Sequence, residues 1–194
     1  MASRWYVSLS LVRRVTFRGC ALAGTLVAFS LAVGACGQDK QDANEPTGKY
    51  KVDVLSASFP GRQSLAEDST LKITVQNKDA RTIPNLGVTV DGFYQRREDA
   101  TLADPERPVW IVNQPPFNST SAIASTWTTG PLRAGGTRTL RWNVSALRAG
   151  TYNPRYRVNA GIDGKATAES FDGRPATGSF TVRISREPKS LEEN

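Results

Sequence analysis

The chain has 194 residues, with 25 Lys and Arg against 18 Asp and Glu, two Cys and no His, for a formal net charge of +7. The absence of His excludes a Ser-His-Asp or Cys-His nucleophile, a His-ligated metal and a His pH switch, and two Cys alone cannot form a structural zinc site. Apolar residues make up 39% and charged residues 22% of the chain, a balance that is typical of globular proteins.

The first 35 residues have the pattern of an export signal. They contain no acidic residue, and the apolar segment 20–33 follows four basic residues, Arg4, Arg13, Arg14 and Arg18. A basic start, a short apolar segment and small residues after it are typical of a secretory signal peptide, and the segment is short for a membrane span. The residues after Arg13-Arg14 do not match the usual twin-arginine continuation. We therefore predict export by the Sec route and cleavage of residues 1–35, rather than a retained signal anchor.

The tetrapeptide Val33-Gly34-Ala35-Cys36 closes this segment. It resembles the bacterial lipobox, in which an aliphatic residue and two small residues precede a Cys. The resemblance implies that the signal is cleaved before Cys36 and that the Cys36 thiol carries a diacylglyceryl group. Two or three acyl chains hold a protein firmly on a membrane. We therefore predict that the lipid on Cys36 anchors the protein to the extracytoplasmic face of the bacterial cell membrane.

Cleavage before Cys36 removes four basic residues and no acidic residue, so the net charge of the remaining chain falls to about +3. Nucleic acid is not an expected partner, because phosphate binding needs a stripe of basic residues. With Cys20 removed and Cys36 lipidated, no thiol remains for a disulfide. No metal or cofactor is expected either, since the Asp-Gly pairs lack acidic residues at alternate positions and are interpreted as turns.

Two polar segments flank the predicted domain. Lipidated Cys36 begins a segment, 36–49, that is polar, lacks periodicity and contains Pro46 and Gly48, which is typical of a flexible tether. As a coil it spans roughly 20 Å. Residues 187–194 are predicted to be a polar tail, which leaves 50–186 as the domain.

Apolar and polar residues alternate with a period of two throughout 50–186. The clearest segments are 71–75, 88–90, 140–144, 156–160 and 180–184, and turn residues separate them at 77–79, 134–136, 149–150 and 163–164. Strands of this kind pack one face on a core and leave the other in water. No segment has the apolar stripe of a long helix. The predicted fold class is all-β, an antiparallel immunoglobulin-like β-sandwich of about seven strands.

Short motifs agree with this fold class. The segment Leu147-Arg148-Ala149-Gly150-Thr151-Tyr152 resembles the corner before strand F of fibronectin-III and related immunoglobulin-like sandwiches. That resemblance implies that the Tyr152 hydroxyl bonds back to upstream backbone. Residues 130–142, together with Val75-Gln76-Asn77, resemble bacterial cell-surface adhesion modules of the CARDB type. An antibody-type domain is excluded because no inter-sheet disulfide is possible, and the motifs indicate fold rather than function.

The segment 91–130 makes the domain longer than a minimal sandwich and is predicted to be an irregular insertion. Such insertions at a sheet edge are often functional, although a solvated loop that covers the edge is the interpretation we favour. The candidate binding residues in it are Arg96, Arg97, Trp110 and Trp127. Trp142 alternates with apolar residues and is predicted to be in the core.

Two functional hypotheses follow. The first is a non-enzymatic surface lipoprotein whose domain binds an envelope protein or polymer. The second is a module that binds or hydrolyses glycans, with Trp110 and Trp127 stacking on sugars and two of Asp99, Asp104 and Glu106 as the carboxylate pair. No catalytic residues are expected under the first hypothesis, and the second is rejected if both Trp side chains are buried and the carboxylates are paired with Arg. A third possibility is a structural spacer with no ligand.

Overall fold

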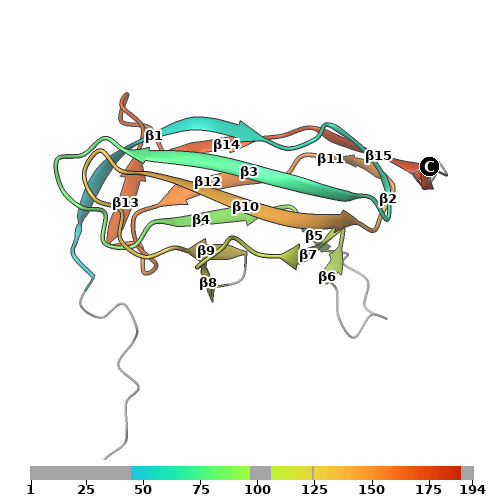
Figure 1. Cartoon of the computed structure of the whole chain (residues 1–194), viewed down its shortest axis with the longest axis horizontal. Coiled ribbons are helices and arrows are strands. Elements are labelled where there is room, and N and C mark those ends of the chain that lie inside the picture. Colours follow the sequence, from blue (N-terminus) through green and yellow to red (C-terminus); the bar gives the residue numbers. More distant parts are fainter. Residues whose placement is uncertain (1–44, 97–105, 124, 189–194) are drawn as a thin grey trace, which may run out of the picture. The chain divides into compact units, whose positions relative to one another are not determined.

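The computed structural model describes residues 45–96, 106–123 and 125–188. These residues form fifteen β-strands and contain no helix that could cross a membrane, and the predicted all-β fold class is confirmed. The predicted signal peptide, the lipobox with Cys36 and most of the tether lie outside the described residues, as does the end of the polar tail. The two large sheets face each other as the layers of a sandwich (Figure 1).

The first large sheet has the strand order β13-β1-β3-β10-β7. Its strands are β13 (Ala166–Glu169), β1 (Gly48–Ser58), β3 (Asp68–Asn77), β10 (Thr137–Ala146) and β7 (Trp110–Gln114). Strand β13 runs parallel to β1, and the other neighbours are antiparallel. In β3, Leu71, Ile73 and Val75 are buried while the residues between them face solvent, so the period of two in the sequence follows the pleat of the strand.

The second large sheet has the strand order β14-β12-β4-β9-β8, and all its neighbours are antiparallel. Its strands are β14 (Thr177–Ser179), β12 (Arg155–Asn159), β4 (Gly87–Asp91), β9 (Thr126–Thr128) and β8 (Thr120–Ile123). Val88 and Val90 on β4 and Val158 on β12 point into the core. Their neighbours on the same strands therefore point outward, away from the first sheet.

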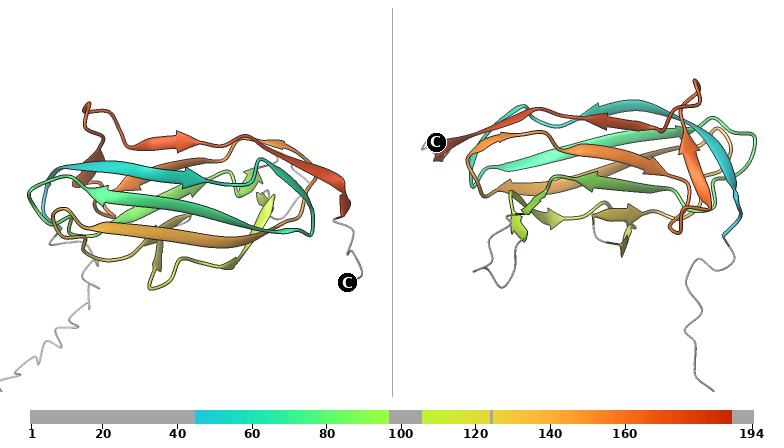
Figure 2. Two further views of the ribbon diagram at one scale, coloured as in Figure 1. Left: turned by 45° about the horizontal axis from the view of Figure 1, so that its top comes forward. Right: turned by 180° about the vertical axis from the view of Figure 1, so that it is seen from behind.

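Two smaller sheets complete the domain. One has the order β11-β15-β2, with β11 (Gly150–Tyr152), β15 (Val182–Pro188) and β2 (Arg62–Leu65), in which β15 and β2 are parallel. The other pairs β5 (Tyr94–Arg96) with β6 (Glu106–Pro108). Strand β2 and the end of β15 lie at the end of the sandwich opposite to the start of β1 and to β13 (Figures 1 and 2).

The core between the large sheets is rich in aromatic rings. Trp127 and Trp142 pack edge to face with ring centroids 5.6 Å apart, and Phe93 contacts both Trp110 and Trp127. Aromatic pairs of this geometry add stabilisation beyond the area that they bury. Trp142 is fully buried, as its alternation with apolar residues predicts.

The structure corrects the predicted irregularity of 91–130 and the predicted boundary between tether and domain. The described part of 91–130 is not irregular, because it forms five short strands, of which β7 joins the first sheet and β8 and β9 join the second. Strands of three to five residues are too short for their alternation to be recognised in the sequence. Gly48 and Lys49 belong to the domain rather than to the tether, since they pair with Ala166 and Thr167 of β13.

Candidate binding site

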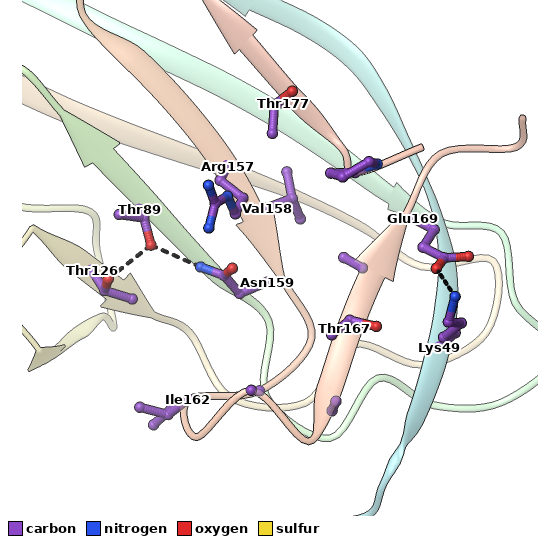
Figure 3. Close-up of a pocket in the computed structure, with 15 residues that line it drawn as sticks. Lys49, Thr89, Thr126, Arg157, Val158, Asn159, Ile162, Thr167, Glu169 and Thr177 are labelled. Carbon is purple, nitrogen blue, oxygen red and sulfur yellow. Dashed lines mark hydrogen bonds and ion pairs between the residues drawn. The ribbon is translucent and has the colours of Figure 1, made fainter. Parts of the chain in front are cut away.

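A pocket of about 740 Å³ lies where the outward face of the second sheet meets β13 (Figure 3). Four parts of the chain line it: the strands β4, β9, β12 and β14, the strand β13 with the start of β1, the loop that joins β12 to β13, and Pro175 in the loop that joins β13 to β14. Its volume is within the range of ligand-binding clefts. Its polar lining residues include Thr89, Thr126, Arg157, Asn159 and Thr177.

Cross-strand hydrogen bonds order one side of the pocket. The hydroxyl oxygens of Thr89 and Thr126 are 2.8 Å apart, and Asn159 Nδ2 donates to the Thr89 hydroxyl oxygen at 2.8 Å. Thr89 and Thr126 occupy opposed positions on β4 and β9, a pairing that stabilises antiparallel sheets. The three side chains therefore form a fixed polar surface before any ligand arrives (Figure 3).

Arg157 supplies the uncompensated charge of the pocket. It lies on β12, directly opposite Thr89 on β4 and Thr177 on β14, and is exposed. In the described part of the chain, its guanidinium has no ion-pair partner. A guanidinium in this position can donate in a bidentate manner to a carboxylate or phosphate, or to paired hydroxyl oxygens.

The opposite side of the pocket carries the only lining carboxylate that the structure describes, and that carboxylate is paired. Glu169 Oε1 is 2.7 Å from Lys49 Nζ, and Glu169 Oε2 is 3.4 Å from Lys51 Nζ. The bond from Lys49 keeps the pKa of Glu169 below its usual value. Since Glu169 is neutralised and Arg157 is not, the pocket as a whole is cationic.

The loop at the base of the pocket is held by the residues that precede β1. The Glu45 carboxylate accepts the backbone N–H of Ile162 at 3.1 Å and that of Asp163 at 3.4 Å. Burial, together with the neighbouring Asp163, raises the pKa of Glu45, while bonds from Lys165 lower the pKa of Asp163 to about 2. These contacts fix the loop 160–165 against the start of the domain, so the pocket is preformed.

The lining of the pocket combines polar and apolar groups. Hydroxyl, amide, ammonium and guanidinium groups line it together with the apolar side chains of Val158, Ile162 and Pro175, and none of its described lining residues is aromatic. In the described residues, no group of three or more His, Cys, Asp or Glu side chains is placed to hold a metal ion. The pocket can hydrogen-bond polar groups and attract negative charge.

The structure contradicts the proposed role of Trp110 and Trp127 in stacking on sugars. Trp110 has 0% of its surface exposed, and its Nε1 donates to Gln63 Oε1 at 2.7 Å inside the core. Trp127 is 9% exposed and packs on Trp142. Neither ring presents a face to solvent. Both residues lie on short strands that the sequence pattern did not reveal, so their inward direction could not be read from it.

The other predicted site residues of the insertion are not tested by the structure. Arg96 ends β5, and its side chain, like that of Glu106 at the start of β6, lies outside the described part. Arg97, Asp99 and Asp104 lie outside the described residues altogether. Their roles, and the lipidation of Cys36, stay predictions.

The predicted tyrosine corner is confirmed. The Tyr152 hydroxyl donates to the backbone oxygen of Ala149 at 3.2 Å, three residues upstream. The Tyr152 ring packs edge-on to Trp110, with centroids 5.5 Å apart. The corner therefore ties β11 to the same core cluster that holds Trp110.

The sequence did not identify the pocket. Arg157 and Asn159 were recognised as polar positions of a strand, which is correct, but nothing marked them as a site. The usable signal was that both positions share one face of a strand. Their assembly with Thr89 and Thr126 depends on the pairing of β12 with β4 and of β4 with β9, which the sequence does not specify.

Comparisons with known proteins concern the fold. No protein family and no curated protein sequence matches this chain. Among solved structures it is similar to the CARDB domain of a Pyrococcus furiosus protein, crystallised in complex with di-metal ions, at 15% identity over 71% of this chain and 96% of that one, with a TM-score of 0.43. It is also similar to the cupredoxin domain of amoB from Nitrosocaldus yellowstonii, at 12% identity over 76% of this chain and 94% of that one, with a TM-score of 0.40.

A PapD-like domain of human CEP192 matches at 12% identity over 75% of this chain and 89% of that one, with a TM-score of 0.38. Similarity at this level carries no ligand or activity over to the present chain. The facing sheets and the Tyr152 corner define the class of the domain, which is an immunoglobulin-like β-sandwich.

Proposed function

We propose that this protein is a non-enzymatic, lipid-anchored protein of the bacterial cell envelope whose immunoglobulin-like domain binds an envelope polymer in the pocket around Arg157. The anchor is supported by the lipobox resemblance at Val33-Gly34-Ala35-Cys36. The observation that carries the binding function is the Arg157 guanidinium, which has no ion-pair partner among the described residues and is set among ordered Thr and Asn side chains in a preformed pocket.

A polymer is favoured over a protein as the partner because of the chemistry of the lining. Energetically dominant residues of protein interfaces are enriched in Trp, Tyr and Arg, and of these types only Arg157 lines the pocket in the described part of the chain. Hydroxyl, amide and guanidinium groups match the hydroxyl and acidic groups of glycans and polyol polymers. A tether of roughly 20 Å would keep the domain close to the membrane while allowing it to turn toward such a polymer.

The binding function is tested with residues 36–194 carrying Cys36→Ser, mixed with sedimented cell envelope before and after protease treatment of the envelope. We expect co-sedimentation that survives the protease and weakens at high salt, because Arg157 contributes through charge. Arg157→Gln should weaken binding about tenfold, as expected for loss of a charge-assisted hydrogen bond.

Arg155→Gln is the matched control. Arg155 is exposed on the same face of β12, two positions away, and does not line the pocket. Loss of binding after protease treatment would mean that the partner is a protein, and equal binding by the two variants would reject the pocket as the site.

The anchor is tested in cells of the source type. The full-length Cys36→Ser variant should appear in the soluble extracytoplasmic fraction, whereas the unmodified protein should sediment with membranes and partition into detergent. A variant that still sediments with membranes after alkaline washing would mean either that lipidation is not the means of attachment or that residues 1–35 are retained as a signal anchor; the mass of the variant distinguishes the two.

A further inference from the structure

Two arginine residues lie side by side on the outward face of the small sheet β11-β15-β2. Arg183 on β15 is in register with Arg62 on the parallel strand β2 and with Thr151 on the antiparallel strand β11. Both arginines are exposed. Two positions further along the same face, Ser64 and Ser185 are in register, and their hydroxyl oxygens are 3.3 Å apart.

In the described part of the chain, neither Arg62 nor Arg183 has an acidic partner. Glu67 is the carboxylate that lines the same groove, and its Oε2 accepts the backbone N–H of Ser64 at 2.7 Å. Like charges at directly paired positions of a sheet repel each other. An anion held between the two guanidinium groups would remove that repulsion.

The core holds this face in place. Gln63, between Arg62 and Ser64, is only 4% exposed; its Oε1 accepts the Trp110 indole N–H at 2.7 Å, and its Nε2 donates to the Pro60 oxygen at 3.0 Å. On β15, Val182 and Ile184 are buried on either side of Arg183. Because the inward side chains are packed in the core, the backbone that carries the outward arginines and serines is held in one conformation. Less conformational entropy is therefore lost when a ligand binds.

We propose that Arg62, Arg183, Ser64 and Ser185 form an oxyanion-binding site for the phosphate or carboxylate groups of an acidic envelope polymer. These four residues line a groove of about 560 Å³ together with Gln63 and Glu67. Paired guanidinium groups present parallel donors to two oxygens of one anion. The Ser185 hydroxyl donates to the Glu187 oxygen at 2.9 Å and lies 3.3 Å from the Ser64 hydroxyl oxygen, so the Ser64 hydroxyl is the one whose proton can turn to the anion. Strand β2 and the end of β15 lie at the end of the sandwich opposite to β13 (Figure 1), and β13 lines the pocket around Arg157, so the proposed site is a second contact.

The test is a titration of ¹⁵N-labelled residues 36–194 carrying Cys36→Ser with two probes, glycerol 3-phosphate and a trimer of galacturonic acid. We expect amide shifts that saturate and are confined to β2, β15 and the turn before β2 for at least one probe. Saturation with the phosphate probe alone identifies a polyol phosphate as the source of the anion, and saturation with the uronate alone identifies an acidic glycan. Confined shifts with both probes support the oxyanion site for either source.

The double variant Arg62→Gln/Arg183→Gln should weaken the saturating titration about tenfold, the effect of losing charge-assisted contacts. The matched control is Lys72→Gln/Arg141→Gln, which removes another in-register pair of cations, on β3 and β10, and leaves the small sheet intact. The control should change the affinity less than about twofold, because non-specific charge attraction is weak at physiological salt. No saturating shift on β2 and β15 with either probe, or equal weakening by both double variants, would overturn the proposal. Arg157→Gln should leave these shifts unchanged, so the outcome is independent of the pocket.

Discussion

Replacement of Asn77 by Ala should destabilise the turn after β3, because it removes the side-chain amide that holds this turn by hydrogen bonds. Asn77 is 0% exposed, although Asn is a polar residue that is seldom fully buried without partners. Its Nδ2 donates to the backbone oxygens of Arg81 at 2.8 Å and Leu132 at 2.9 Å, and its Oδ1 accepts the backbone N–H of Asp79 at 2.9 Å. One amide thus joins the 77–81 turn to the segment that precedes β10.

The expected loss of stability follows from these three bonds. Each of these buried or partly buried hydrogen bonds contributes about 1 kcal/mol net, so Asn77→Ala should lower the free energy of unfolding by about 3 kcal/mol. The Leu132 oxygen retains the N–H of Ile83 at 2.9 Å, which limits the cost of leaving that acceptor without Asn77. In a domain of this size the change corresponds to a fall in melting temperature of about 10 °C.

The measurement is urea unfolding followed by Trp fluorescence, since Trp127 and Trp142 are buried in the core. Gln76→Ala is the control, because Gln76 is the neighbouring residue and its side chain makes one exposed hydrogen bond, to the Gly135 oxygen at 3.3 Å. The control should change stability by less than about 0.5 kcal/mol. If Asn77→Ala were no less stable than Gln76→Ala, the assignment of a structural role to the buried amide would be refuted.

Three further perturbations test the corner, the core and the pocket. Tyr152→Phe should lower stability by about 1 kcal/mol in thermal unfolding, since only the hydroxyl bond is lost, and an unchanged melting temperature would contradict the corner. Trp110→Phe should cost about 2–3 kcal/mol in urea unfolding, because Gln63 Oε1 is left buried without its donor; a loss below about 1 kcal/mol would argue against that bond. Because Lys49 lowers the pKa of Glu169, the stability due to this carboxylate is present at neutral pH and is lost as the pH falls below about 4.5. Glu169→Gln should therefore show a smaller loss of stability than the unmodified protein as the pH falls from about 5 to about 3, and parallel pH curves would contradict the ion pair.

The long strands could be predicted from the sequence, and the reason is local. Residues 71–75 and 140–144 alternate strictly, so their burial pattern repeats what the sequence shows, with Leu71, Trp142 and Val144 inside. The tyrosine corner was equally accessible, because the Tyr152 hydroxyl reaches back only three residues. Features whose partners lie within a few residues leave a recognisable pattern in a single chain.

The short strands could not be predicted, and the prediction that Trp110 and Trp127 are binding residues was wrong for this reason. Trp110 and Trp127 occupy strands of five and three residues, in which alternation has too few positions to indicate a direction. Their partners are distant in sequence, as Gln63 is from Trp110. Only the packed structure shows that both rings lie in the core.

The sequence by itself therefore determined the fold class, because a strand pattern repeats every two residues. Export and lipidation at Cys36 stay predictions, which the sequence alone could suggest because a signal peptide is recognised as a linear segment. The tertiary structure alone decided where binding groups gather. Arg157 meets Thr89 and Thr126 only through two antiparallel pairings, and Arg62 meets Arg183 only through the parallel pairing of β2 with β15. Pairing between strands far apart in the chain depends on the closure of long loops and on the burial of shared core residues, and neither is written in any local stretch of sequence.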